Sequence, residues 1–346
     1  MKPIARALSL APVLALSVLV APAGAQTEPA DDTVADVVNA HILPRFQMLA
    51  DQTQRLADAA AADCNAKSAA LRSAYGDAFD AWISASHLRF GPSEANDRAF
   101  ALAFWPDSRG ATPRALAGLI SEQDPIAATG GDYGQVSIAA RGFYAMEYVL
   151  YDDTLMSAGD APYHCQLVQT ISADMATTAR HIFEDWQSTY ADIMMNPSDA
   201  GIYRSDDEVL QEIFKSLSTG LQFTAEARLG RPLGTFARPR PTRAEAWRSG
   251  RSARHVMLSL TALRDLALRL AGDDADLAGK LDAGFDRASS QLHALGDPIF
   301  AGVARPQTRL KIEVLQQSIE AIRTTVRAEL GPKIGVAAGF NALDGD

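Results

Sequence analysis

Hydrophobic residues recur along most of this chain every three or four positions, which is the spacing of one face of an α-helix. Runs of Val, Ile and Thr are few, no Asn-Gly turn joins two apolar segments, and the helix-favouring residues Ala, Leu and Arg are abundant. We therefore expect an all-α fold. The predicted helices cover residues 34–62, 66–89, 112–121, 135–151, 161–195, 206–229, 243–270, 275–295 and 307–330.

The connections between these helices indicate how the chain divides. Most are short, which is typical of helical bundles, and the helices are too numerous for one four-helix bundle. A Pro- and Arg-rich stretch at residues 231–241 is the best linker, and Thr242 with Glu245 forms a capping-box pattern for the helix that follows. We expect two packed four-helix-bundle domains, at residues 33–230 and 231–346, which can share helices.

The N-terminus has the features of a cleavable signal peptide at residues 1–25. Two basic residues precede an apolar stretch at 7–20, and Ala-Gly-Ala at 23–25 forms a cleavage site. The apolar stretch is shorter than the roughly 20 residues that span a bilayer. A polar, disordered tail at 26–32 would then open the mature protein. No cysteine stands directly after the cleavage site, and no later segment is apolar and long enough to cross a membrane. We expect a periplasmic or cell-envelope protein that is neither a lipoprotein nor membrane-spanning.

The net charge argues against one class of partner, and the two cysteines suggest a covalent link within the chain. Signal removal would change the net charge from −10 to about −12, and so acidic a chain is a poor nucleic-acid binder. In an oxidising compartment Cys64 and Cys165 are expected to form a disulfide that closes a loop of about 100 residues. Two buried thiols are the alternative.

The helix at residues 135–151 carries the most notable polar pattern. Tyr144 and Glu147 lie on a stripe with other tyrosines, and a second, apolar stripe follows another face. Both faces are bulky, so Glu147 should be buried or face a cavity, where a carboxylate needs a cation, hydrogen-bond donors or a metal. A purely structural ion pair would also satisfy it.

Two further clusters could line a pocket. The first combines aromatic and charged side chains where a helix ends, namely Trp82, His87, Arg89, Trp105 and Asp107. The second places Arg248 and Ser249 near a helix start, where free amides favour anions. A packed connection and a solvated basic face are the respective structural alternatives.

Common catalytic signatures are missing from the sequence. It contains no His-Glu-x-x-His zinc motif, no Gly-x-Ser-x-Gly elbow and no phosphate-binding loop. The six histidines are scattered, and no two stand three or four residues apart.

Taken together, these residues resemble the imelysin family, also called imelysin-like peptidases. The matching landmarks, in family order, are Leu43-Pro44, Arg-Phe-Gly-Pro at 89–92, Phe-Trp-Pro-Asp at 104–107, Gly-Phe-Tyr-Ala-Met-Glu-Tyr at 142–148, Trp-Arg-Ser-Gly at 247–250 and Gly-Phe-Asn-Ala-Leu-Asp-Gly-Asp at 339–346. The resemblance implies two four-helix bundles related by duplication, a site in the cleft between them, an envelope location and a link to iron acquisition.

The resemblance also identifies one departure. The family motif Gly-x-His-x-x-Glu reads Gly-Phe-Tyr-Ala-Met-Glu at 142–147, so Tyr144 replaces the histidine. A phenol with a pKa near 10 binds divalent metal weakly. Three alternatives remain open: Tyr144 and Glu147 hold a ferric ion, they bind another ligand through hydrogen bonds, or they only pack.

We therefore expect a non-enzymatic binding protein for iron or another nutrient, with a small molecule or metal as ligand and an iron ion as the candidate cofactor. Glu147 would accept hydrogen bonds or share a metal beside Tyr144. One wall of the cleft would contain Trp82, Arg89, Trp105 and Asp107, and the opposite wall Arg248 and Ser249. The alternatives are a metal-dependent peptidase, and an interaction module that docks on an envelope protein and keeps a vestigial site.

Overall fold

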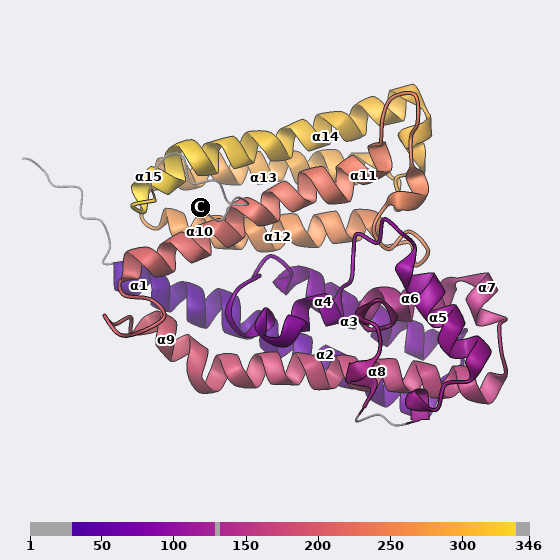
Figure 1. Ribbon diagram of the computed structural model, residues 1–346. Coiled ribbons are helices and arrows are strands. Elements are labelled where there is room, and N and C mark those ends of the chain that lie inside the picture. Colours follow the sequence, from indigo (N-terminus) through magenta and orange to yellow (C-terminus); the bar gives the residue numbers. More distant parts are fainter. Residues whose placement is uncertain (1–29, 129–131, 337–346) are drawn as a thin grey trace, which may run out of the picture.

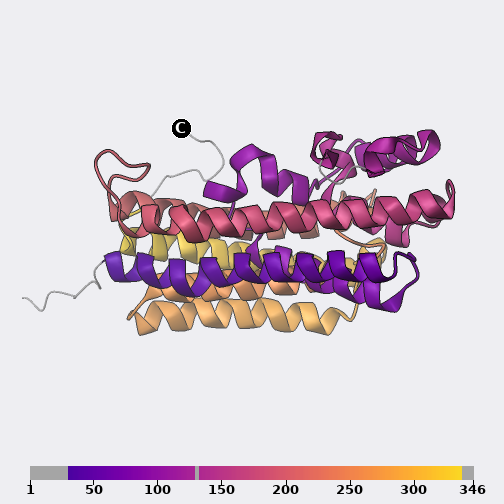
Figure 2. The same ribbon diagram turned by 90° about the horizontal axis from the view of Figure 1, so that it is seen from below.

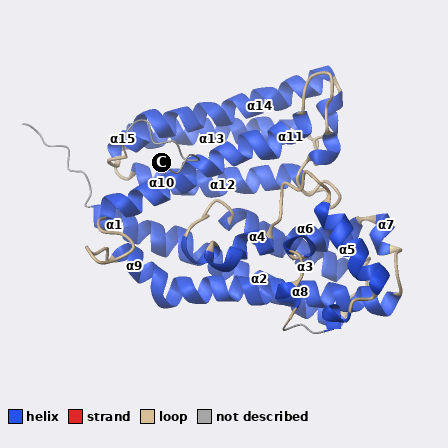
Figure 3. Ribbon diagram, viewed as in Figure 1, coloured by secondary structure: helices blue, strands red, loops and turns tan. Residues whose placement is uncertain are grey.

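The computed structural model describes residues 30–128 and 132–336, and these form helices joined by loops, without a strand (Figure 3). The all-α prediction is confirmed. The predicted signal peptide and the landmark at 339–346 lie outside the described residues. No described helix is both long and apolar enough to span a membrane.

The first bundle is built on long helical arms that pack side by side (Figures 1 and 2). These arms are α1 (Ala30–Asp36) continuing through η1 (Val37–Ile42) into α2 (Leu43–Ala62), then α3 (Ala69–Ala85), and α8 (Ala161–Asp185) continuing through η7 (Trp186–Tyr190) into α9 (Ala191–Met195). The helix thus begins within the segment that we assigned to a polar tail.

Short helices between α3 and α8 fill the remaining position of this bundle. They are η2 (Gly91–Ser93), η3 (Ala95–Asp97), α4 (Arg98–Leu102), α5 (Ala111–Glu122), η4 (Pro125–Ala128), η5 (Tyr133–Gln135), η6 (Ile138–Ala140), α6 (Gly142–Tyr151) and α7 (Asp153–Met156). Of these, α4 and α6 contact α8 directly.

The second bundle packs above the first in Figure 1, and α12 contacts α3. Its elements are α10 (Asp206–Gln222), η8 (Phe223–Leu229), α11 (Gly230–Leu233), η9 (Pro241–Arg243), α12 (Ser252–Ala271), α13 (Ala275–Leu295), η10 (Ala301–Ala304), α14 (Pro306–Thr325), η11 (Val326–Leu330) and α15 (Gly331–Lys333). Because α10 packs on α12 and α14, the helices of this bundle begin at Asp206 rather than after the boundary at 230. The Pro- and Arg-rich stretch is a turn within the bundle.

The capping-box prediction is wrong, and its failure matters for the site. Helix α12 begins at Ser252, so Thr242 and Glu245 precede it in an irregular segment. The Glu245 side chain is buried and pairs with Arg228 instead of capping a helix. A tertiary ion pair therefore overrides a local hydrogen-bonding pattern.

Gly142 fixes where α6 begins. The expected helix from residue 135 is interrupted, and α6 starts only at Gly142, which has a φ of +73°. A Cβ atom at this position would lie 2.2 Å from the carbonyl oxygen of Leu102. Only glycine allows the two backbones to approach this closely, and this approach sets the position of the next residues of α6.

Aromatic stacking holds α6 against α3 and α12. The Phe79 ring on α3 stacks on Phe143 at 4.6 Å and contacts His255 of α12 edge-on at 4.4 Å. Phe79 also meets the Tyr144 ring edge-on. These contacts place the Tyr144 phenol at the interface between the two bundles.

The predicted disulfide is confirmed. Cys64, just after α2, is bonded to Cys165 on α8, with Cα atoms 5.0 Å apart. It ties two arms of the first bundle together at their ends.

Candidate functional site

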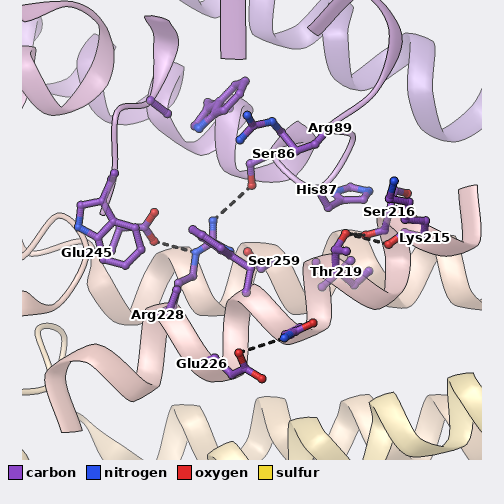
Figure 4. A pocket seen from close by; sticks show the side chains of 18 of the residues that line it. Ser86, His87, Arg89, Lys215, Ser216, Thr219, Glu226, Arg228, Glu245 and Ser259 are labelled. Carbon is purple, nitrogen blue, oxygen red and sulfur yellow. Dashed lines mark hydrogen bonds and ion pairs between the residues drawn. The ribbon is translucent and has the colours of Figure 1, made fainter. Parts of the chain in front are cut away.

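A cavity of about 370 Å³ lies between the two bundles, and we call it the main cavity (Figure 4). Its size is within the range of small-molecule sites. The first bundle and the loop after α3 contribute Trp82, Ser86, His87, Arg89, Ala103, Trp105 and Tyr144. The second contributes Glu212, Lys215, Ser216, Thr219, Gly220, Gln222, Phe223, Glu226, Ala227, Arg228, Glu245, Ser259 and Leu263.

Aromatic rings form one part of the cavity wall. Trp105 stacks on Tyr144 at 6.1 Å between centroids and meets Phe223 edge-on at 5.8 Å. Trp82, which is buried, lines the same cavity. Flat apolar surfaces of this kind bind planar ligands through dispersion and stacking.

A buried charged cluster closes another part of the wall. The Tyr144 hydroxyl donates to Glu245 Oε1 at 2.5 Å, and Arg228 Nε donates to Glu245 Oε2 at 2.7 Å. Burial acts to raise the pKa of Glu245, but Arg228, His255 and the Tyr144 hydroxyl together lower it to about 2. Burial and the Glu245 charge raise the pKa of Tyr144 well above its ordinary value. Glu245 is therefore ionised and Tyr144 is a neutral donor.

Glu147 faces a second, smaller cavity of about 100 Å³, which we call the side cavity. Trp105 and Tyr144 line both cavities and separate them. Glu147 Oε1 accepts hydrogen bonds from the Ser249 amide at 2.9 Å and from its hydroxyl at 2.8 Å. Burial raises the pKa of Glu147 in spite of these donors.

Arg248 also lines the side cavity. Its Nε donates to Asp152 at 3.0 Å, and its guanidinium lies 3.9 Å from the centroid of the Tyr148 ring. Arg248 and Ser249 thus lie opposite α6, but around the side cavity instead of the main one. Ser249 contacts Glu147 without lining either cavity.

Asp107 and Arg89 have structural partners. Both carboxylate oxygens of Asp107 accept backbone amides at the start of α5, including Ala111 at 2.9 Å and Thr112 at 2.8 Å, so Asp107 caps that helix. These donors outweigh burial and lower the pKa of Asp107. Arg89 pairs with Glu94 at the rim of the main cavity.

The structure thus distributes the predicted residues over two neighbouring cavities. The main cavity contains Trp82 and Arg89, the side cavity contains Asp107, Glu147 and Arg248, and Trp105 and Tyr144 lie between the two.

Sequence reasoning missed the face of α10 and η8, from Glu212 to Arg228, together with Ser259. The i, i+4, i+7 spacing of Glu212, Ser216 and Thr219 is the one pattern that could have pointed to a polar face there.

A polar chain that crosses the bundle interface ends at the main cavity. His41 of η1 lies with Nδ1 2.7 Å from Asp265 Oδ2 of α12, and with Nε2 2.9 Å from Nε2 of His87. His41 is fully buried, whereas Asp265 is 35% exposed. The pKa of His41 is lowered to about 4, mainly by burial. The hydrogen bond to Asp265 and its charge act to raise this pKa, but Arg45 and Arg269 pair with the same carboxylate and their charges lower it.

The arrangement of Tyr144 and Glu147 does not fit a resident metal ion. Tyr144 is a neutral phenol that donates to Glu245, and Glu147 is engaged with Ser249. Within residues 30–128 and 132–336, no group of three or more His, Cys, Asp or Glu side chains is arranged to hold a metal.

Two helical bundles that enclose a cavity at their interface define the class of protein. The chain belongs to the imelysin family, since the family model Peptidase M75 (Imelysin) matches residues 42–326. A relative, "Iron-regulated protein A" of Synechococcus elongatus, is 22% identical over 328 residues, covering 88% of this chain and 86% of that protein.

Solved structures show the same fold. An imelysin-like protein from Psychrobacter arcticum 273-4 superimposes with a TM-score of 0.75 at 21% identity, over 90% of this chain and 97% of that chain. A putative iron-regulated protein A precursor from Parabacteroides distasonis superimposes with a TM-score of 0.74 at 14% identity, over the same shares of the two chains.

Proposed function

We propose that the chain is an exported, non-enzymatic binding protein that holds a small organic ligand in the main cavity and takes part in iron or other nutrient handling. The observation that carries this proposal is the cavity itself, which is built from both bundles and contains a buried hydroxyl without a partner. Ser259 lines the cavity at 4% exposure, and its Oγ forms no hydrogen bond within the described residues. A buried polar atom of this kind costs free energy unless a ligand or water satisfies it.

The link to nutrients comes from the relatives. Two of them are named for regulation by iron, one as a precursor. A signal peptide at residues 1–25 would place the present chain in the same compartment as nutrients that enter the envelope.

Export is tested separately from binding. Expressed with its own N-terminus, the protein should appear in the periplasmic fraction, and N-terminal sequencing should begin at Gln26. Recovery of an intact N-terminus from the cytoplasmic fraction would overturn export without affecting the cavity.

Binding is tested by calorimetry with metals, haem, siderophores and small organic acids, and by the fluorescence of the cavity tryptophans. We expect at least one organic compound to bind, and Phe223→Ala to weaken it. Phe236→Ala is the matched control, because Phe236 is 75% exposed and lies outside the cavity. A screen in which nothing binds, or in which both variants behave alike, contradicts the proposal.

A further inference from the structure

The hydrogen-bonded chain from Asp265 through His41 to His87 determines which ring nitrogens carry protons. An ionised carboxylate only accepts hydrogen bonds, so His41 Nδ1 must carry the proton that it shares with Asp265 at 2.7 Å. A neutral His41 then has a bare Nε2. This atom can only accept at 2.9 Å, so Nε2 of His87 is the donor. By elimination, Nδ1 of a neutral His87 holds a lone pair and no proton.

Neutrality of both rings is favoured by their surroundings. Burial lowers the pKa of His41 and of His87, and two guanidinium groups, Arg45 and Arg228, lower that of His87 further. Among these neighbours, Asp265 is the one carboxylate whose charge raises the pKa of His87. Asp265 does not contact His87, because His41 lies between them.

The bare nitrogen belongs to a ring that lines the main cavity. His87 is 6% exposed, its Nε2 edge faces the fully buried His41, and its Nδ1 forms no hydrogen bond with any described residue. Figure 4 shows His87 beside Lys215, Ser216 and Thr219, on the side of the cavity opposite Arg228 and Glu245. This end of the cavity therefore presents an acceptor.

Lys215 adds a positive charge to the same end. Its ammonium group forms no ion pair or hydrogen bond in the part of the chain that the structure describes, whereas Arg89 and Arg228 are paired with Glu94 and Glu245. The serine and threonine hydroxyls nearby donate to carbonyls of their own helix. Lys215, whose charge interacts with that of Glu212 at the cavity wall without forming a salt bridge, thus lies beside an acceptor and near aromatic walls.

We propose that the Asp265–His41–His87 chain fixes His87 as a hydrogen-bond acceptor in the main cavity, where it selects an aromatic hydroxy acid. The ligand hydroxyl donates to His87 Nδ1, its carboxylate faces Lys215, and its ring packs against Trp105 and Phe223. His41 and Asp265 act as positioning residues. This inference rests on the proposed function, because it assigns the specificity of the same cavity.

The test uses two probes that differ only at the donor, 4-hydroxybenzoate and 4-methoxybenzoate. The wild-type protein should bind the hydroxyl probe at least about tenfold more tightly, because the methyl ether leaves a buried acceptor unpaired. His87→Phe should abolish the difference between the probes. Lys215→Met should weaken both probes and keep the difference.

Several outcomes overturn the inference. These are equal binding of the two probes by the wild type, discrimination that survives in His87→Phe, or no binding of either probe at millimolar concentration. If another compound from the screen still binds in a Phe223-dependent manner, the proposed function stands and only this specificity fails. If nothing binds, both fail.

A second measurement does not depend on a ligand or on the folding of a His87 variant. Nitrogen-15 NMR of the wild-type protein at pH 7 should show His87 with a protonated Nε2 and an unprotonated Nδ1. Asp265→Asn should disturb this tautomer and reduce the discrimination between the probes, while Asp282→Asn, which removes an exposed carboxylate from the Arg264 pair, should change neither. The opposite tautomer in the wild type contradicts the inference.

Discussion

The hydroxyl of Tyr144 lies 2.5 Å from Oε1 of Glu245, and this contact joins helix α6 of the first bundle to the segment before α12 in the second. The two residues stand 101 positions apart in the chain. Arg228 binds the other oxygen of the same carboxylate, so the ionised Glu245 is satisfied from both bundles. Tyr144 is thus a hydrogen-bond donor between the bundles.

Tyr144→Phe should therefore destabilise the protein. The change removes a donor from a buried carboxylate, and we expect a loss of about 1–3 kcal/mol in the free energy of unfolding, measured with urea. Tyr133→Phe is the control, because Tyr133 is also buried but donates to a neutral carbonyl, that of Ala140. It should cost about 1 kcal/mol. A smaller effect at Tyr144 than at Tyr133 would contradict the assignment.

Mild acid should destabilise the protein through its buried histidines. The pKa of His41 is lowered from 6.5 to about 4 by burial, so the unfolded chain binds a proton between these values that the folded protein does not bind. Stability is then fully present above pH 6.5 and is lost as pH falls toward 4. His41 alone should account for about 2 kcal/mol between pH 7 and pH 5. Buried His87 and His255 act in the same direction.

The measurement is guanidinium unfolding at pH 7 and pH 5 for the wild type and His41→Gln, whose amide does not titrate. The variant should lose about 2 kcal/mol less than the wild type over this interval. His181→Gln, on an exposed position of α8, should keep the wild-type dependence. Identical pH dependence in the wild type and His41→Gln is the result that would refute the role of His41.

Gly142→Ala should be strongly unfavourable. Gly142 has a left-handed backbone conformation, and the added methyl group would clash with the Leu102 carbonyl oxygen. We expect the free energy of unfolding to fall by about 1–3 kcal/mol and α6 to be displaced from α4. Gly279→Ala, at an open and exposed position within α13, should instead stabilise by about 0.5–1 kcal/mol. Thermal unfolding distinguishes the two, and a neutral Gly142→Ala variant would be inconsistent with the close approach.

The disulfide should contribute substantially to stability. Cys64 and Cys165 are 101 residues apart, and closing a loop of this length stabilises by up to about 4.7 kcal/mol on the chain-entropy model. The double variant Cys64→Ala/Cys165→Ala should unfold at a clearly lower denaturant concentration. Mass spectrometry of the protein purified without reductant should find no alkylatable thiol before reduction. Two labelled thiols would contradict this prediction.

Much of the fold could be predicted because its helices are amphipathic and their ends carry local signals. The predicted helices at 275–295 and 206–229 agree with α13 and with α10 plus η8. Predictions failed where tertiary contacts override such signals. At Gly142 a close approach of two backbones sets the helix start, and at Glu245 an ion pair replaces a cap.

The site was only partly predictable for the same reason. Burial of Tyr144 and Glu147 could be inferred from two bulky stripes on one helix, and the structure finds both residues buried. Their hydrogen-bond partners, Glu245 and Ser249, lie in a segment about 100 residues away. The helical spacing of side chains predicts contacts only between residues close in sequence, so these pairs could not be predicted.

The amino-acid sequence by itself determined the all-α class, the helical segments and the pair of cysteines, because these follow from local spacing and composition. Only the tertiary structure decided that α10 belongs with the second bundle, that Trp105 and Tyr144 separate two cavities, and that Asp265, His41 and His87 form one chain. The physical reason is that hydrogen bonds and packing across the bundle interface depend on distances in space, which local patterns along the chain do not specify.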